Sequence, residues 1–328
     1  MIIKTLEFHG FKSFVSELLE LKDLTLLTGL NSSGKSSVIQ SILLLEKAAR
    51  KEKLYLSGHG SLSEFKNPFT NSLGIAATFD NDSFISIADE KSDSSGPVQF
   101  PEIIYVCADR FGPETSMPVF VDSLKLGKKG ENIHKCIEHF ADYPLPELLQ
   151  HQNSEGLTFL FNLRAWLSVV SPNVNFQSEI QDIADSSFAT FNGFRSKNVG
   201  FGLSYALPVI VALLLGSIIE NSLVMIENPE AHLHPRGQVE IARLISLCVR
   251  SGTQVIIETH SDHLFDGIRI QAKNSTDGFF SKIKVYWFEL DKNNNTSSQE
   301  ADVDEDGRLD KWPTGLFDQF GINASKLL

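Results

Sequence analysis

The sequence contains the run Gly29-Leu30-Asn31-Ser32-Ser33-Gly34-Lys35-Ser36, which fits the pattern of a phosphate-binding loop in full. An apolar segment at residues 24–28 precedes the run, and residues 37–50 after it have the apolar spacing of a helix. In this order of strand, glycine-rich turn and helix, backbone N–H groups and a helix N-terminus surround phosphate groups. We expect Lys35 to contact the β- and γ-phosphates of a nucleotide and the Ser36 hydroxyl to bind Mg²⁺. The predicted nucleotide-binding residues of the run and its following position are Gly29, Asn31, Ser32, Ser33, Gly34, Lys35, Ser36 and Ser37.

A second apolar segment, Leu223-Val224-Met225-Ile226-Glu227, ends in a carboxylate. Such a strand can be purely structural, but beside a phosphate loop it fits a Walker B element, whose acid holds the hydration shell of Mg²⁺ opposite Ser36. We therefore expect Glu227 to act on the metal through water. Three residues later, Glu230 could orient or deprotonate the water that attacks the γ-phosphate. Both carboxylates are predicted to be catalytic.

A third apolar segment, residues 254–258, is followed by Thr259-His260-Ser261-Asp262-His263. The carboxyl ends of strands in α/β sheets form the edge at which ligands bind. A single histidine is often structural, but at this edge His260 is well placed to sense the γ-phosphate. We therefore add His260 to the predicted catalytic residues.

The composition of the 328 residues is that of a globular protein, with 42% hydrophobic residues and a formal net charge of -12. The negative balance argues against a generally cationic surface that coats nucleic acid, so any DNA contact has to be a local patch. The three cysteines have neither disulfide nor zinc spacing, and the N-terminus lacks a signal-peptide pattern. A cytoplasmic protein is therefore expected.

The most apolar stretch of the sequence is residues 205–219. It is shorter than the ~18 residues that a membrane-spanning helix needs. We interpret it as a buried core helix, and we expect no membrane partner.

Helix and strand patterns around the phosphate loop predict an α/β fold, that of a P-loop NTPase, with two additions. Residues 72–108 alternate short apolar runs with turn residues and predict a lobe of antiparallel hairpins that includes residues 103–106. Residues 121–196 show helical segments separated by Pro, Asn and Gly, and are interpreted as an inserted helical lobe. The nucleotide-binding core then spans residues 1–120 and 197–328, with strands at 222–226, 254–258 and 282–290, a helix at 237–250 and a polar loop at 293–298.

The ABC type is assigned because the motifs resemble a known family. The sequence is similar to ABC-type ATPases that include the chromosome-maintenance and RecF repair proteins, the ATPase domain of OLD nucleases and small ATPases of phage-defence operons. Three stretches carry the resemblance beside the phosphate loop: Ile226-Glu227-Asn228-Pro229-Glu230-Ala231-His232-Leu233-His234-Pro235, Asp109-Arg110-Phe111-Gly112-Pro113 and Trp312-Pro313-Thr314-Gly315-Leu316-Phe317-Asp318. They lie from one end of the chain to the other.

The resemblance implies a homodimer in the ATP state, in which ATP on one subunit's loop is capped by the signature serine of the other. Ser204 ends the run Val199-Gly200-Phe201-Gly202-Leu203-Ser204 at the signature position, His260 matches the switch histidine, and residues 231–235 match a loop that crosses the dimer interface. Tyr205-Ala206 replaces the consecutive glycines of transporter subunits, which disfavours a transporter. Asn228 occupies the usual position of the catalytic Glu. Because an amide cannot accept a proton, we expect hydrolysis to be slow or to depend on Glu230.

We therefore interpret the chain as an ATP-driven, dimerising switch, with ATP and Mg²⁺ as cofactors, that works with a separately encoded effector in DNA maintenance or phage defence. An ATP-dependent scaffold with negligible hydrolysis is the alternative that Asn228 leaves open. Lysine and arginine clusters at residues 47–53 and 125–129 could contact DNA or form solvated faces. Arg110 could reach the nucleotide or form a buried pair with Asp109 or Glu227.

Overall fold

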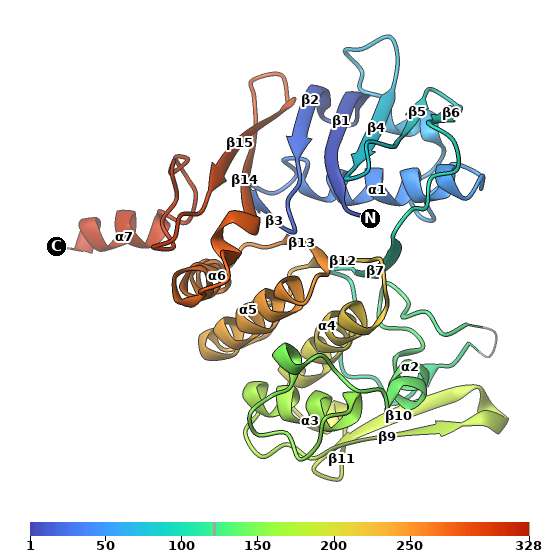
Figure 1. Ribbon diagram of the computed structural model, residues 1–328, viewed down its shortest axis with the longest axis vertical. Coiled ribbons are helices and arrows are strands. Elements are labelled where there is room, and N and C mark those ends of the chain that lie inside the picture. The colour runs from blue at the N-terminus through green and yellow to red at the C-terminus, as the bar shows by residue number, and fades with distance from the viewer. Residues whose placement is uncertain (121–122, 328) are drawn as a thin grey trace. The chain divides into compact units, whose positions relative to one another are not determined.

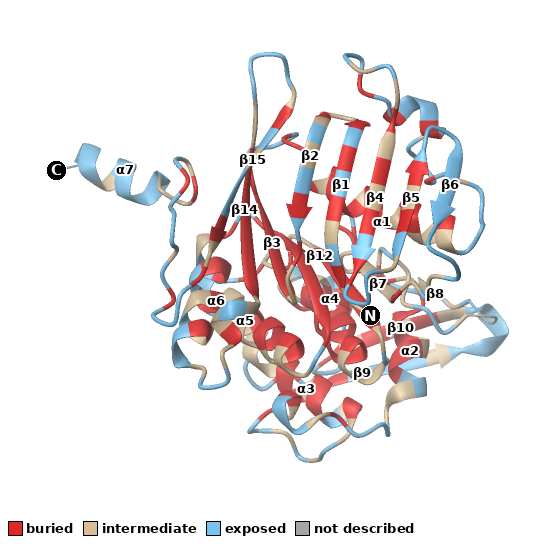
Figure 2. Cartoon of the chain, turned by 45° about the horizontal axis from the view of Figure 1, so that its top comes forward, coloured by how far each residue is buried: buried red, intermediate tan, exposed pale blue. Residues whose placement is uncertain are grey.

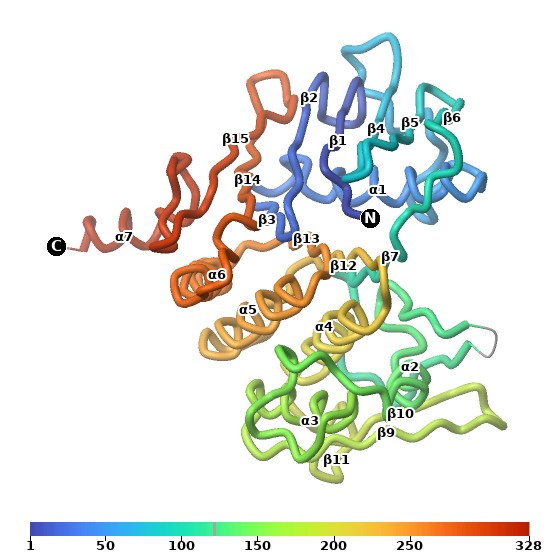
Figure 3. Tube along the Cα trace, viewed as in Figure 1, coloured from blue at the N-terminus to red at the C-terminus, as the bar shows by residue number. Residues whose placement is uncertain are grey.

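The structure, a computed structural model, describes residues 1–120 and 123–327 and divides into two compact units. Unit 1 comprises Met1–Pro101 and Phe280–Leu328, and unit 2 comprises Glu102–Phe279. The N-terminal and C-terminal parts of the chain thus both belong to unit 1, and they are drawn in blue and in red in Figure 3. The boundaries of the two units differ from the predicted boundaries of the nucleotide-binding core and the inserted helical lobe. The core-and-lobe division stays a prediction, and its first boundary, at residues 121–122, lies outside the described residues.

An antiparallel sheet in unit 1 contains the predicted hairpins. Its strands are ordered β2-β1-β4-β5-β6 (Figure 1). Their bounds are Ile3–Phe11 for β1, Phe14–Glu20 for β2, Gly74–Phe79 for β4, Phe84–Ala88 for β5 and Lys91–Ser94 for β6. Buried residues alternate along β4 and β5, which is the period of a strand with one covered face. The hairpin prediction for this part of residues 72–108 is confirmed.

The strand and helix around the phosphate loop also belong to unit 1. Strand β3 (Leu24–Gly29) pairs in parallel with β14 (Ile283–Leu290), which pairs antiparallel with β15 (Thr296–Asp302). Helix α1 (Lys35–Ala49) begins directly after the loop and packs against β4 and β5. The predicted polar loop is wrong from Thr296 onward, because that residue begins β15. A short 3-10 helix (Leu62–Phe65) and the C-terminal helix α7 (Gln319–Leu327), which has no buried residue among those described, complete the unit.

Unit 2 is built on three parallel strands in the order β13-β12-β7. The strands are β7 (Glu102–Val106), β12 (Ser222–Glu227) and β13 (Gln254–Glu258), and α5 (Pro235–Arg250) connects the last two. This confirms the predicted β-α-β unit. The expected antiparallel hairpin at residues 103–106 is wrong, because β7 lies parallel to β12. Five of the six residues of β12 are buried, as is typical of a strand covered on both faces.

Helix α4 (Phe201–Ile218) is the core helix of unit 2 and packs against α3, α5, β7 and β12. It starts four residues earlier than predicted and reaches 18 residues, with a mean hydropathy of 2.1. Length and composition alone would therefore suffice to cross a bilayer. However, 67% of the helix is buried inside the protein (Figure 2), which is how a core helix behaves. The core-helix interpretation accounts for its apolar sequence.

The stretch predicted as a helical lobe is only partly helical. Its helices are α2 (Ile133–Phe140) and α3 (Phe159–Val170), with a 3-10 turn at Glu147–Leu149 between them. The expectation of helix is wrong after residue 175, where the chain forms β9 (Phe176–Gln181), β10 (Ser186–Phe191) and β11 (Phe194–Arg195). Strand β10 pairs with β9, β11 and the two-residue strand β8 (Met117–Pro118). Helix α6 (Asp262–Asn274), which packs on α5, completes unit 2.

Candidate nucleotide-binding site

Two glycines give the phosphate loop its shape. Gly29 ends β3 with φ +135°, and a Cβ atom there would lie 2.2 Å from the carbonyl oxygen of Phe288. Gly34 precedes α1 with φ +109°, and its Cβ would lie 2.7 Å from Thr296 Oγ1. Both positions combine a left-handed backbone with contacts that exclude a side chain. The sequence pattern therefore reflects real steric limits in unit 1.

The Lys35 side chain is held inside the loop. It is only 3% exposed, and its Nζ donates hydrogen bonds to the carbonyl oxygens of Gly29 (3.1 Å) and Leu30 (2.7 Å). Ser33 Oγ donates to the same Leu30 oxygen at 2.7 Å. The ammonium group thus lies over the concave side of the turn, where a phosphate bound by this loop would meet it.

The N-terminus of α1 fits an anion. Its first turn contains no acidic residue, and its N-cap, Gly34, makes no side-chain capping hydrogen bond. First-turn N–H groups lack helical partners, and the helix dipole places partial positive charge there, so an anion is favoured. Ser37 is buried, Ser36 is half-buried, and the predicted loop residues Asn31 and Ser32 are exposed. The loop of unit 1 can therefore hold a nucleotide phosphate chain.

Sequence reasoning missed two hydroxyl residues beside the loop. Thr296, the first residue of β15, donates from Oγ1 to the carbonyl oxygen of Ser33 at 2.9 Å. The same hydroxyl lies 2.6 Å from Ser13 Oγ, and the Thr296 N–H donates to the Ser13 carbonyl oxygen at 2.7 Å. Thr296 is separated from Ser33 by 263 residues, so no local pattern could have indicated this support.

In unit 2, the Glu227 carboxylate at the end of β12 is fixed by two donors. Tyr105 donates from its hydroxyl to Oε1 at 2.8 Å, and the Ala108 N–H donates to Oε2 at 2.9 Å. Burial, with the nearby Glu227 charge, raises the pKa of Tyr105 far above its usual range, so the phenol keeps its proton. A carboxylate has further lone pairs beyond these two bonds. Glu227 can therefore also accept from water on a Mg²⁺ ion.

No group of three or more His, Cys, Asp or Glu side chains forms a metal cage within residues 1–120 and 123–327. The Mg²⁺ site expected from Ser36 and Glu227 stays a prediction. Mg²⁺ keeps several waters and is bound through one or two protein groups and the substrate phosphates, not by a dedicated cage. The residues present fit such an ion.

Arg110 binds the backbone that follows β12. The guanidinium is 3% exposed and donates to the carbonyl oxygens of Glu227 (2.9 Å), Asn228 (2.8 Å) and Tyr205 (3.0 Å). Of the two expected partners, Glu227 is bound through its carbonyl oxygen and not through its carboxylate. Asp109 is not a partner of Arg110 and pairs with Lys129 instead. Burial lowers the pKa of Arg110. The arginine fixes the turn that carries the predicted catalytic residues.

The structure brings Glu230 and His260 together. The His260 N–H donates to Glu230 Oε1 at 2.9 Å, while the His260 side chain is exposed. Burial raises the pKa of Glu230, although the hydrogen bond from His260 opposes the shift. A carboxyl group with a raised pKa accepts a proton more readily, which suits a general base. Within the described chain, Glu230 Oε2 is buried and has no hydrogen-bond partner.

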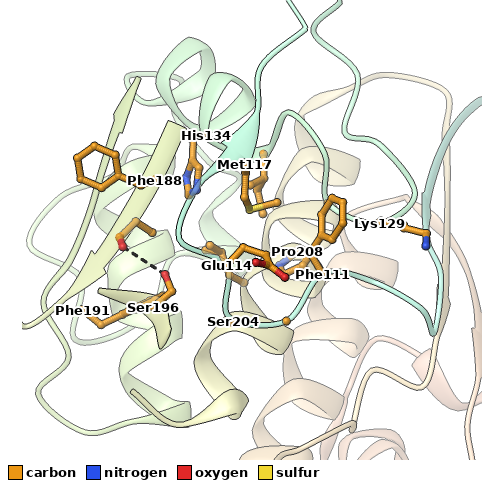
Figure 4. Close-up of a pocket in the computed structure, with 15 residues that line it drawn as sticks. Phe111, Glu114, Met117, Lys129, His134, Phe188, Phe191, Ser196, Ser204 and Pro208 are labelled. Carbon is orange, nitrogen blue, oxygen red and sulfur yellow. Dashed lines mark hydrogen bonds between the residues drawn. The ribbon is translucent and has the colours of Figure 1, made fainter. Parts of the chain in front are cut away.

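Ser204, the predicted signature serine, lies in the first turn of α4 and is 9% exposed. Its hydroxyl is buried without a protein partner in the described residues and lines a pocket of about 400 Å³, counted with its open mouth (Figure 4). His134 also lines this pocket, and its Nδ1 is buried without a protein partner among the described residues. Burial lowers the pKa of His134 to about 4. Its apolar walls include Phe111, Met117, Phe188, Phe191 and Pro208. The role of Ser204 in capping a nucleotide stays a prediction.

Family profiles of AAA domains match two parts of the chain. Residues 1–155 match a family described as "AAA ATPase domain", and residues 138–266 match one described as "AAA domain, putative AbiEii toxin, Type IV TA system". Residues 281–327 match a family described as "Protein of unknown function (DUF3696)". No curated protein matches the sequence.

Solved structures share the fold. An Smc head bound to the C-winged helix domain of ScpA is 14% identical, with a TM-score of 0.61 and a match over 93% of this chain and 99% of that chain. An Smc head domain with an extended coiled coil, bound to the C-terminal domain of ScpA derived from Pyrococcus furiosus, is 13% identical, with a TM-score of 0.58 and full coverage of both chains. At this identity the likeness establishes the fold alone, which is that of an Smc head domain.

Proposed function

We propose, from the premise that the chain is an ABC-type AAA ATPase with the fold of chromosome-maintenance heads, that it binds and hydrolyses one ATP per subunit. The observation that carries the proposal is the buried Lys35 ammonium inside a loop that tolerates only glycine at both turns. Lys35 contacts the β- and γ-phosphates, and the N–H groups at the start of α1 bind phosphate oxygens. Ser36 and Glu227 hold Mg²⁺, the latter through water.

The chemical step follows from the two carboxylates of unit 2. Bound Mg²⁺ supplies charge neutralisation on the phosphates. Glu227, fixed by Tyr105 and Ala108, orients the hydration shell of the ion. Glu230 is the general base, because its buried carboxyl group has a raised pKa and one unpartnered oxygen within the described chain. His260, whose backbone holds Glu230, senses the γ-phosphate with its exposed side chain.

ATP holds two copies of the chain together, with Ser204 of each copy facing the nucleotide of the other. Because Ser204 is buried within its own unit, the first turn of α4 has to open toward the partner when the dimer forms. The dimer drives a separately encoded effector in the cytoplasm, in DNA maintenance or phage defence. The toxin–antitoxin description of one matched family and the ScpA-bound Smc heads favour such a partner, and DNA is a further ligand of the dimer.

A scaffold that binds ATP without turnover is the second candidate, and Asn228 favours it. An amide at this position cannot remove a proton from water. A stable ATP-bound dimer with intact nucleotide in the wild type would identify the scaffold. Rapid release of phosphate would exclude it.

Equilibrium binding of ATP with Mg²⁺ tests the nucleotide site. Lys35→Ala should lose at least about tenfold in affinity, because the buried ammonium contacts two phosphates. Lys4→Ala is the matched control, since Lys4 is an exposed lysine of the same unit. Equal affinity of Lys35→Ala and the wild type would contradict the proposal. Light scattering of Glu230→Gln with ATP should give twice the mass of the nucleotide-free chain.

A further inference from the structure

The turn that follows β12 holds two side-chain oxygens that are buried and have no hydrogen-bond partner among residues 1–120 and 123–327: Oδ1 of Asn228 and Oε2 of Glu230. They lie two residues apart in the turn that follows β12, where the Ala231 N–H donates to the Asn228 carbonyl oxygen at 3.0 Å. Buried polar atoms are nearly always hydrogen-bonded to protein or to ordered water. Two unpartnered acceptors in one turn therefore indicate a donor that the protein itself does not provide.

The protein holds both side chains in place. Asn228 has φ +46°, its N–H donates to the Glu258 carbonyl oxygen at 2.7 Å, and its own carbonyl oxygen accepts from Arg110 at 2.8 Å. Glu230 is fixed through Oε1, which accepts from the His260 N–H. The two remaining oxygens are thus fixed acceptors at a turn whose backbone conformation is uncommon for a residue other than glycine.

We infer that Asn228 is a positioning residue, and that Asn228 Oδ1 and Glu230 Oε2 accept the two hydrogen atoms of the attacking water. This inference rests on the proposed function. A water that donates both hydrogens to these oxygens turns its lone pairs away from them, toward the phosphorus. Its oxygen forms the bond to the γ-phosphorus, the bond to the β–γ bridging oxygen breaks with its electrons on ADP, and Glu230 takes one proton.

The Asn228 side chain can orient the attacking water, but it cannot act as the base. Asn228 Oδ1 accepts a hydrogen bond, but the neutral amide does not take up the proton. The proton therefore goes to Glu230. With Asn228 in place of a glutamate, Asn228 orients the water and Glu230 removes its proton, so turnover is not abolished.

Two substitutions separate the side chain from the backbone. Asn228→Gly tolerates φ +46° and keeps the carbonyl oxygen that Arg110 binds, but it removes Oδ1. Asn228→Asp keeps an oxygen at the same place. Asn173→Gly is the matched control, because Asn173 is an exposed asparagine of the same unit with φ +61°. We expect kcat to fall roughly 10- to 100-fold in Asn228→Gly with KM and ATP affinity unchanged, and to stay closer to the wild type in Asn228→Asp.

A double variant tests whether the two oxygens hold one water. Asn228→Gly combined with Glu230→Gln should be no slower than Glu230→Gln alone, because groups that act as a unit are not additive. A crystal structure of the nucleotide-free wild type should show a water within hydrogen-bond distance of both oxygens, and the Asn228→Gly crystal should lack it.

The outcomes distinguish this inference from the proposed function. Full turnover in Asn228→Gly together with lost turnover in Glu230→Gln would overturn the inference and leave the proposed function standing. Absence of turnover in the wild type would overturn the proposed function. In that case the crystal structure of the nucleotide-free wild type still tests the inference, because the absence of a water bound by both Asn228 Oδ1 and Glu230 Oε2 would refute it.

Discussion

The backbone N–H of His260 donates a 2.9 Å hydrogen bond to Oε1 of Glu230, so the second residue after β13 holds the carboxyl group in the turn after β12. The two strands are parallel neighbours with Glu227 opposite Glu258, which brings both carboxyl ends to the same edge of the sheet. A displacement of His260 therefore changes the position of Glu230 directly. This is a short physical connection between the residue proposed to sense phosphate and the residue proposed to remove a proton.

Turnover should depend on pH through Glu230. Its carboxyl group must be ionised to act as a base, and burial raises its pKa above the ordinary glutamate value. The rate should therefore fall on the acid side at a higher pH than an exposed glutamate would give. The pH profile of kcat/KM measures this limb, and a profile that is flat down to the ordinary glutamate range would refute the assignment.

The free energy of unfolding should depend on pH in the sense opposite to turnover: the contribution of Glu230 falls as pH rises. Because the folded pKa of Glu230 is raised, the unfolded chain releases this proton first as pH rises, and folding stability falls between the unfolded and folded pKa values. Glu230→Gln removes the penalty, so its stability relative to the wild type should increase from acid to neutral pH. Denaturant unfolding at several pH values measures the difference.

Arg110→Ala should destabilise the protein severely. The substitution leaves the carbonyl oxygens of Tyr205, Glu227 and Asn228 without their buried donor. At ~1–3 kcal/mol for each unsatisfied group, a loss of roughly 3 kcal/mol or more in unfolding free energy is expected. Arg110→Lys should recover only part of the lost stability, because the lysine ammonium group cannot reproduce the planar arrangement of donors of the guanidinium group. A loss below about 1 kcal/mol by denaturant unfolding would contradict the assigned role.

Gly29→Ala should abolish nucleotide binding. At φ +135°, its Cβ would meet the Phe288 carbonyl oxygen at 2.2 Å, so the loop and β14 cannot keep their present positions. Gly96→Ala is the control, because Gly96 has φ +113° in the same unit and no described atom within 4 Å of its Cβ position. Binding of ATP by Gly29→Ala with unchanged affinity would show that the loop is not the phosphate site.

Local patterns in the sequence predicted the parts of the fold that local physics determines. The phosphate loop was predictable because Gly29, Gly34 and Lys35 satisfy steric and electrostatic limits within a few residues of each other. The β-α-β unit of β12, α5 and β13 was predictable because its apolar runs are continuous and its helix is amphipathic.

Other features could not be predicted because distant partners determine them. The strand β7 is parallel because β12, more than 100 residues later, lies beside it, and an isolated apolar run does not reveal strand direction. Strands β9 and β10 lie within the stretch that we interpret from the sequence as a helical lobe, and they pair with each other. The contacts of Arg110 with the carbonyl oxygens of Tyr205, Glu227 and Asn228 likewise depend on the tertiary fold.

Steady-state phosphate release with Mg²⁺ and ATP tests the central claim most directly, measured for the wild type beside Lys35→Ala and Glu230→Gln. The controls are Lys4→Ala and Glu220→Gln, which make the same chemical changes at exposed positions of the same units. We predict turnover in the wild type and both controls, and a loss of roughly 100-fold or more in Glu230→Gln and Lys35→Ala. Unchanged turnover in Glu230→Gln, or none in the wild type with or without DNA, would contradict the account.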